Sequence, residues 1–170
     1  MQTSIGLDGT DAGLRPVGVA EPERASDGRR RRKRKRPTSP PAPPLAAGRL
    51  ADLPEASGYR GAILEALDRI DDWVPKGVHF GWEASFKNKG KFPAAMNKEA
   101  ARRLVAHLLH AAPLAVYENA RDGQPVDQQF RVVVDAGAVV GSRGQERIRV
   151  IIVRDGAGFV IENAFPVYLR

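Results

Sequence analysis

Histidine and lysine gather in one short part of the sequence, and both residue types suit chemistry on a phosphate group. His79 is followed by Lys87, Lys89 and Lys91, and the last two lie ten and twelve residues beyond it. A histidine can transfer protons near neutral pH, and a nearby lysine can place positive charge on a phosphate. The alternative for this segment is a solvated loop with an exposed histidine.

Aromatic rings are dense around the same histidine. Five rings, among them His79, Trp82 and Phe92, fall within fourteen residues. An exposed tryptophan can hold single-stranded RNA by stacking on a base, so Trp82 is a candidate RNA-binding residue. Phe92 is expected instead to anchor the loop or the core.

Two arginines near the end of the chain are candidates for a basic nucleic-acid surface. Arg147 and Arg149 are two positions apart in a stretch that reads as a strand, so they project from one face of a sheet. The apolar residues at 148, 150 and 152 point to the other face and into the core. A basic sheet face suits a nucleic-acid groove, and it equally suits surface solubility.

The two other histidines lie further along, in a predicted helix. His107 is three residues after Leu104 and one before Leu108, a spacing that favours packing against the core. His110 falls in the last turn, where a cation interacts favourably with the helix dipole. Both are therefore expected to have structural roles.

Two helices must position the histidine loop. Apolar residues at helical spacing predict the first helix over 59–73, with Ser57 or Gly58 as its cap. The second is predicted over 98–112, after the cap residue Asn97 and before Pro113. Glycines and a proline predict an irregular loop over 76–93.

The rest of the chain reads as strands. Apolar and β-branched stretches predict them at 114–117, 130–134, 147–153 and 159–165, and Arg154–Gly158 suits a hairpin turn between the last two. The sequence therefore predicts an α+β fold in which two N-terminal helices pack on a C-terminal antiparallel sheet.

Residues 1–50 are predicted to be a disordered basic and proline-rich tail, followed by one folded domain over 51–170. The tail carries most of the net charge of +7, because residues 1–48 hold ten Lys/Arg and five Asp/Glu. The basic run Arg29–Arg36 suits RNA affinity through counterion release, nuclear targeting or solubility alone. Five prolines within Pro37–Pro44 favour a stiff polyproline II spacer.

Composition also limits where and how the protein works. The absence of cysteine excludes a disulfide framework and a thiolate metal site. The sequence has no apolar run near Met1 and none of about 18 residues elsewhere, so we expect no signal peptide and no membrane span. A secreted form would need another route or a larger carrier.

The order of motifs in the second half of the chain resembles that of bacterial EndoU nucleases. Those enzymes carry a glycine-preceded histidine, a glycine- and lysine-rich stretch, Phe-Pro before a helix, and a final hairpin that ends in Thr-Ala-Phe/Tyr-Pro. This chain has Gly77-Val78-His79, then Lys87–Pro93, and later Asn163-Ala164-Phe165-Pro166. The resemblance covers about residues 76–166, a little over half of the chain.

The resemblance implies an endoribonuclease that cleaves single-stranded RNA by attack of a ribose 2′-hydroxyl and leaves a 2′,3′-cyclic phosphate. In the family this is commonly the toxic module of a bacterial toxin, which acts in a cytoplasm and is neutralised by a cognate immunity protein. Mn²⁺ is the cofactor to test, and no metal ligand is predicted. The implied catalytic residues are His79, Lys89, Lys91 and Asn163, and the implied RNA-binding residues are Trp82, Lys87, Arg147, Arg149 and Phe165.

The chain departs from the family pattern at two positions. No histidine precedes His79, although the family normally has one upstream, and Asn163 takes the place of threonine. A catalytically degenerate RNA-binding protein of the same fold is therefore the main alternative. A small toxin nuclease of the barnase or colicin type, and a protein-interaction module that uses the prolines of 37–44, are the others.

Overall fold

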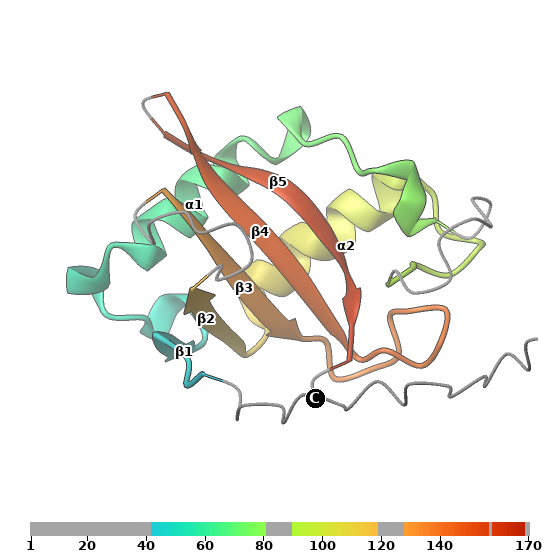
Figure 1. The fold of residues 1–170 in the computed structure, drawn as a ribbon, viewed down its shortest axis with the longest axis horizontal. Coiled ribbons are helices and arrows are strands. Elements are labelled where there is room, and N and C mark those ends of the chain that lie inside the picture. The colour runs from blue at the N-terminus through green and yellow to red at the C-terminus, as the bar shows by residue number, and fades with distance from the viewer. Residues whose placement is uncertain (1–41, 81–89, 119–127, 157, 169–170) are drawn as a thin grey trace, which may run out of the picture. The chain divides into compact units, whose positions relative to one another are not determined.

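Five strands form a single antiparallel sheet in the part of the chain that the computed structural model describes, which is residues 42–80, 90–118, 128–156 and 158–168. Of the tail predicted over residues 1–50, residues 1–41 lie outside the described part of the chain. Two α-helices pack on the sheet, so the α+β class is confirmed (Figure 1). The strands, hydrogen-bonded in chain order, are β1 (Ala46–Gly48), β2 (Leu114–Glu118), β3 (Gln129–Asp135), β4 (Arg147–Asp155) and β5 (Gly158–Val167).

The short strand β1 lies N-terminal to the expected start of the domain at residue 51. Its three residues pair with β2, and the backbone N–H of Leu45 donates to the carbonyl of Val116 at 2.7 Å. The segment Ala-Ala-Gly has no alternating apolar pattern, so its sequence gives no strand signal. Backbone pairing at the edge of a sheet does not require one.

Helix α2 (Lys98–Ala111) begins where the sequence predicts and ends one residue earlier than the predicted 98–112, with Ala112 as its C-cap. The Asn97 side chain accepts a hydrogen bond from the Ala100 N–H at 2.7 Å, which satisfies one of the free donors of the first turn. Pro113 follows two residues after the last helical residue. Local signals therefore determine both ends of this helix.

Helix α1 (Tyr59–Asp68) is shorter than the predicted 59–73. Gly58 caps it with φ of 70°, whereas the Ser57 hydroxyl donates to the Pro54 carbonyl and takes no part in the cap. Arg69 leaves the helical conformation, and its guanidinium lies 3.3 Å from the carboxylates of Asp72 and Asp155. A 3-10 turn over 70–72 replaces the expected last turn.

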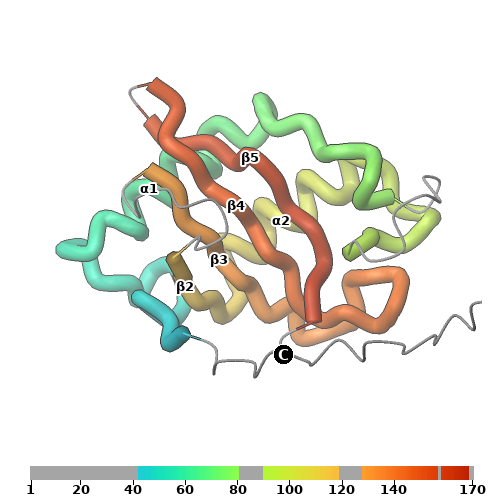
Figure 2. Tube along the Cα trace, in the orientation of Figure 1, coloured from blue at the N-terminus to red at the C-terminus, as the bar shows by residue number. Residues whose placement is uncertain are grey.

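Both helices cover the same face of the sheet, and the strands lie in front of α2 in the view of Figures 1 and 2. Ile148, Val150 and Ile152 of β4 point into this core, as the sequence predicts, and Phe92 is fully buried there. In the described part of the chain, no helix combines the length and the apolarity that a membrane crossing requires.

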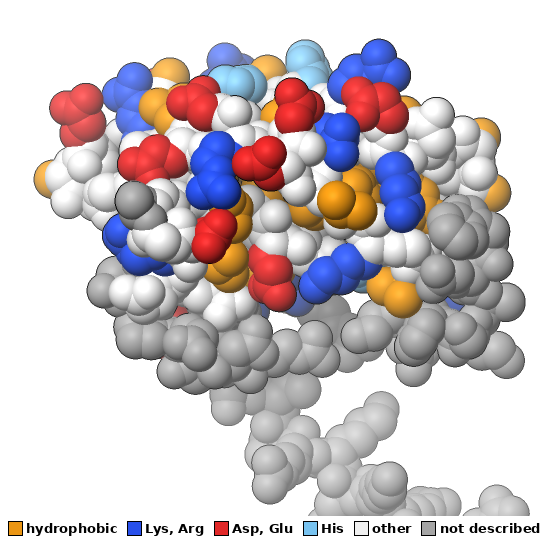
Figure 3. All heavy atoms as spheres, turned by 90° about the horizontal axis from the view of Figure 1, so that it is seen from above, with side chains coloured by type: hydrophobic (Ala, Val, Ile, Leu, Met, Phe, Trp, Pro, Cys, Tyr) orange, Lys and Arg blue, Asp and Glu red, His pale blue; other side chains and the backbone are white. Residues whose placement is uncertain are grey.

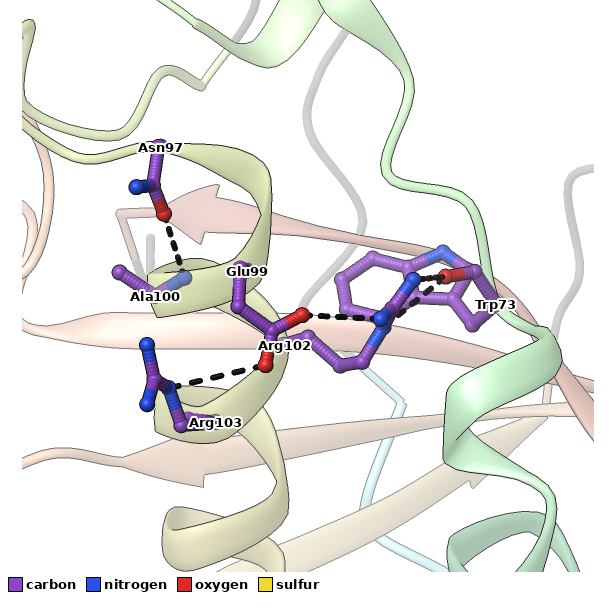
Figure 4. A network of polar contacts seen from close by, with 6 residues as sticks. All are labelled: Trp73, Asn97, Glu99, Ala100, Arg102 and Arg103. Atoms are coloured by element: carbon purple, nitrogen blue, oxygen red, sulfur yellow. Dashed lines mark hydrogen bonds and ion pairs between the residues drawn. The ribbon is translucent and has the colours of Figure 1, made fainter.

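A polar network joins α2 to the segment after α1 (Figure 4). The Arg102 guanidinium donates to the Trp73 carbonyl through Nη2 at 2.9 Å and through Nε at 3.3 Å, and Nη1 contacts Glu99 at 2.9 Å. The Trp73 ring is buried in the core. The network fixes the segment that leads into the histidine loop.

The expectation that His107 packs against the core is wrong, because its side chain is exposed. The buried face of α2 is centred on Ala101, Val105 and Leu108. At 100° per residue, His107 lies well over a quarter-turn from the centre of that face. His110 is also exposed, in the last turn, as predicted.

Candidate functional site

The candidate site lies on the face of the sheet on which neither α1 nor α2 packs, which we call the helix-free face. Strand register places Arg149 beside Val133 on one side and Phe165 on the other. Arg147 shares this face, so the prediction that the two arginines project together is confirmed. The helix-free face is defined by Ala115, Tyr117, Arg131, Val133, Asp135, Arg147, Arg149, Ile151, Asn163, Phe165 and Val167.

A β-bulge in β5 decides which side chains reach this face. Ile152 pairs with Ile161, but Ile151 pairs with Asn163, so Glu162 is an extra residue in the strand. Ile161 therefore stays in the core while Asn163 projects from the same face as Arg149. A strict period of two would have placed residues 161 and 163 on one side.

His79 reaches the edge of this face from the 3-10 turn η4 (Gly77–His79). Its ring stacks on Phe165 of β5, with centroids 4.6 Å apart and planes 7° from parallel. Its Nε2 atom lies 3.3 Å from Nδ2 of Asn163. His79 is therefore brought into contact with two other predicted site residues, which lie more than 80 positions later in the chain.

The hydrogen bonds of the His79 ring define which nitrogen is available for chemistry. Nδ1 lies 2.8 Å from the carbonyl oxygen of Gly90, which can only accept, so Nδ1 carries a hydrogen. In the neutral ring, Nε2 then holds a lone pair that accepts from the Asn163 amide. His79 is only 3% exposed, so a substrate reaches Nε2 only where Asn163 gives way.

Asn163 has an acceptor to spare. Its Oδ1 is buried and has no hydrogen-bond partner within the described residues. A buried acceptor of this kind is costly unless a donor meets it. The site therefore offers an acceptor beside Nε2 for a hydroxyl or N–H group of a ligand.

Gly90 allows the lysine-rich loop to approach the end of β5. A Cβ atom on Gly90 would overlap the backbone carbonyl of Pro166, so only glycine fits here. The neighbouring backbone is held as well, because the Lys91 carbonyl accepts from the Ser142 N–H at 2.8 Å and the His79 carbonyl accepts from the Phe92 N–H at 2.7 Å. The position of Nδ1 is thus fixed by backbone contacts.

Only part of the predicted lysine set can be placed. Lys91 belongs to the described chain and follows Gly90, whose carbonyl contacts the His79 ring, whereas Trp82, Lys87 and Lys89 lie outside the described residues. Lys76, just before η4, contacts Glu162 of the bulge at 3.7 Å. This half-exposed ion pair adds little stability, but it joins the element that carries His79 to β5.

Two residues that sequence reasoning did not single out also belong to the helix-free face. The Arg131 guanidinium lies over the Tyr117 ring, 5.3 Å from its centroid, and Arg149 lies 6.0 Å from the centroid of Phe165. Alternation along residues 129–135 could have predicted that Arg131 points away from the core. Its pairing with Tyr117 on the neighbouring strand was not predictable from the sequence.

The charge on the helix-free face is mainly positive. The residues that define it include three arginines and a single carboxylate, Asp135, which lies 3.3 Å from Arg147 Nε. By contrast, basic and acidic side chains alternate over the side of the domain shown in Figure 3. A ligand with negative charge is therefore better matched to the helix-free face.

The donor set around His79 does not suit a divalent metal. Among the described residues, the His79 ring contacts the Asn163 amide, the Gly90 carbonyl and the Phe165 ring. Within the described residues there is no group of three His, Cys, Asp or Glu side chains arranged to hold an ion. The side chains described around His79 therefore do not form a binding site for Mn²⁺.

Comparisons of the chain with protein-family models, with curated proteins and with solved structures find no match. The resemblance to EndoU nucleases therefore stays a prediction that depends on the motifs of the chain.

Proposed function

We propose that this chain is an endoribonuclease that cleaves single-stranded RNA by 2′-hydroxyl attack and leaves a 2′,3′-cyclic phosphate. The observation that carries the proposal is the convergence of His79, Asn163 and Phe165 at one edge of a basic sheet face. These are a proton carrier, a hydrogen-bonding amide and an aromatic ring, which the reaction and its substrate require.

In the proposed reaction, Nε2 of His79 accepts the proton of the 2′-hydroxyl. The 2′-oxygen then bonds to the adjacent phosphorus, and the bond from phosphorus to the 5′-oxygen of the next nucleotide breaks. Asn163 swings from Nε2 to the substrate, where Oδ1 accepts a hydrogen bond from a ribose or base group. Gly90 holds Nδ1 and so keeps the ring oriented while Nε2 gains the proton.

Arg149 is the described cation best placed for the phosphate. It lies on the helix-free face with its guanidinium 6.0 Å from the centroid of Phe165, the ring on which His79 stacks. A fixed guanidinium near the phosphate stabilises the charge that develops as the 2′-oxygen attacks. The lysines of residues 87–91 add to this charge in the proposed enzyme.

The leaving 5′-oxygen also needs a proton. In-line displacement places this oxygen on the far side of phosphorus from the 2′-oxygen, so His79 does not reach both. Within the described residues, the two other histidines lie on α2, which packs on the opposite face. Water is therefore the proposed donor to the leaving group, and slow turnover is expected.

Cleavage of RNA by the purified protein tests the proposal. Wild type and the His79→Asn variant would be incubated with single-stranded and duplex RNA, with and without Mn²⁺. The asparagine amide can still donate to the Gly90 carbonyl, so the variant keeps the Nδ1 contact and loses Nε2. We expect wild type to cut single strands and the folded variant to leave them intact; intact RNA with folded wild type would refute the enzyme.

A second candidate function is RNA binding without cleavage, favoured by the burial of His79 and by the engagement of both its ring nitrogens. This function predicts salt-sensitive RNA binding that leaves the substrate intact. With either function, a toxin module requires a cognate immunity protein. We propose that this partner covers the helix-free face with acidic side chains. Binding that survives 1 M salt unchanged would contradict both.

A further inference from the structure

A hollow of about 240 Å³ lies on the helix-free face, away from His79. It spans β2, β3 and the start of β4. Its walls combine an aromatic ring, aliphatic side chains, a guanidinium and a carboxylate. The lining residues are Pro113, Leu114, Ala115, Tyr117, Val133, Asp135 and Arg147.

The hollow is in line with the candidate catalytic residues across the sheet. Val133 in its wall pairs with Arg149, and Arg149 pairs with Phe165, on which His79 stacks. Neighbouring strands are about 4.8 Å apart, so two steps place the hollow roughly 10 Å from Phe165. In the strand order, Arg149 stands between Val133 of the hollow and Phe165, so a phosphate on Arg149 would lie between the hollow and the ring on which His79 stacks.

The aromatic wall of the hollow is held in place by a cation. Tyr117 carries the Arg131 guanidinium over its ring at 5.3 Å. Within the described residues, the Nε of Arg131 is buried without a hydrogen bond, and the guanidinium packs on the Tyr117 ring. A ring fixed in this way is a ready surface for a planar, uncharged group.

The polar side chains of the hollow can form hydrogen bonds with the edge of a planar ligand. Asp135 accepts from the Gly137 N–H at 3.0 Å and contacts Arg147 Nε at 3.3 Å. A carboxylate has further acceptor sites, and the arginine has further N–H donors. The hollow thus presents donors and acceptors together, as the edge of a nucleobase requires.

We propose that this hollow is a nucleobase subsite, in which Tyr117 and the walls around Val133 hold a base of single-stranded RNA while an adjacent phosphate lies on Arg149. The proposal rests on the proposed function and adds a second point of recognition to it. A duplex would not fit, because its bases are already stacked and paired.

RNA binding by anisotropy tests the subsite in the His79→Asn background, where the oligonucleotide stays intact. A labelled single-stranded oligoribonucleotide would be compared with a set that lacks one base at each position in turn. Tyr117→Ala should weaken binding roughly 5- to 150-fold, the range for losing one stacked base, whereas Tyr117→Phe should bind like the parent. Ala115→Gln, which fills the hollow and leaves the tyrosine in place, should weaken binding similarly.

The abasic set distinguishes the subsite from general affinity. At one position of the oligonucleotide, removal of the base should weaken binding to the parent protein. The same removal should not weaken binding to the Tyr117→Ala variant any further, because that variant has already lost the stacking contact. Equal affinity of parent, Tyr117→Ala and Ala115→Gln, with weaker binding by Arg149→Ala, would overturn the subsite and keep the proposed function. Absence of RNA binding by the folded parent would overturn both.

Discussion

The Nε2 atom of His79 lies 3.3 Å from the amide Nδ2 of Asn163, 84 positions later in the chain. The contact depends on two local features, the 3-10 turn that ends at His79 and the bulge at Glu162. Since the amide donates to Nε2, it favours the neutral ring with its proton on Nδ1. The contact favours the tautomer in which Nε2 holds the lone pair that can accept a proton. It also makes the protonation of His79 sensitive to the side chain at position 163.

The pH dependence of cleavage should reveal this coupling. With one proton carrier, the rate should rise with pH to a plateau, in place of the bell shape that an acid and a base produce. Asn163→Asp introduces a carboxylate beside Nε2, which favours the protonated ring and should move the rise to higher pH. Rate profiles of both proteins test this; a bell-shaped wild-type profile would show that a second group titrates.

Removal of the phosphate contact should weaken RNA binding in a salt-dependent way. We expect Arg149→Ala to reduce affinity for single strands and to lower the slope of log affinity against log salt by about one. Arg103→Ala, on the exposed side of α2, is the matched control because it removes the same charge elsewhere. If both variants change the slope equally, Arg149 has no special place in the interface.

Gly90 should be intolerant of a side chain. Gly90→Ala places a methyl group against the Pro166 carbonyl, which should cost about 1–3 kcal/mol of folding free energy and displace the acceptor of His79 Nδ1. Gly61→Ala is the control, because open space surrounds that helical position and alanine should stabilise it by about 0.5–1 kcal/mol. Chemical denaturation measures both; a neutral Gly90→Ala would contradict the packing.

Loss of the Arg102 contact with the Trp73 carbonyl should destabilise the domain. Arg102→Lys keeps the charge but cannot make both bonds, and we expect a loss of roughly 1–2 kcal/mol in denaturation experiments. The neighbouring Arg103→Ala should stay within about 0.5 kcal/mol of wild type, because that side chain is 74% exposed. Similar losses in the two variants would show that the network in Figure 4 adds no stability.

Stability should fall at alkaline pH partly through Tyr59. Burial, together with the negative charge of Glu118, raises the pKa of Tyr59 above its usual value of 10.0. The neutral phenol is therefore favoured in the folded state, so its contribution is complete below about pH 10 and is lost as pH rises through the folded pKa. Thermal unfolding between pH 8 and 11 should show a shallower decline for Tyr59→Phe, and parallel curves would exclude this cause.

Local signals in the sequence were sufficient for most of the fold. Asn97 and Pro113 bound α2 because capping and proline act within a few residues. The alternation around Arg147 and Arg149 identified the two faces of β4 for the same reason. The exposure of His107 shows the limit of such signals. Its spacing from Leu104 and Leu108 predicted a buried position, but the side chain lies on the exposed face of α2.

The assembly of the site depends on contacts that no local pattern contains. The bulge at Glu162 follows from the pairing of β5 with β4, and the strand β1 exists only because β2 offers an edge. The convergence of His79 with Asn163 was expected only from a resemblance in motif order. The hollow beside Tyr117 depends on the register of three strands, so it was not predictable at all.

The chemistry of the ends left by cleavage of one defined oligoribonucleotide tests the central claim most directly. We predict a 2′,3′-cyclic phosphate and a free 5′-hydroxyl with wild type, no product when the ribose at the cut is 2′-deoxy, and no product with His79→Asn. Ends that carry a 3′-hydroxyl and a 5′-phosphate, or an RNA that folded wild-type protein leaves intact, would contradict the account.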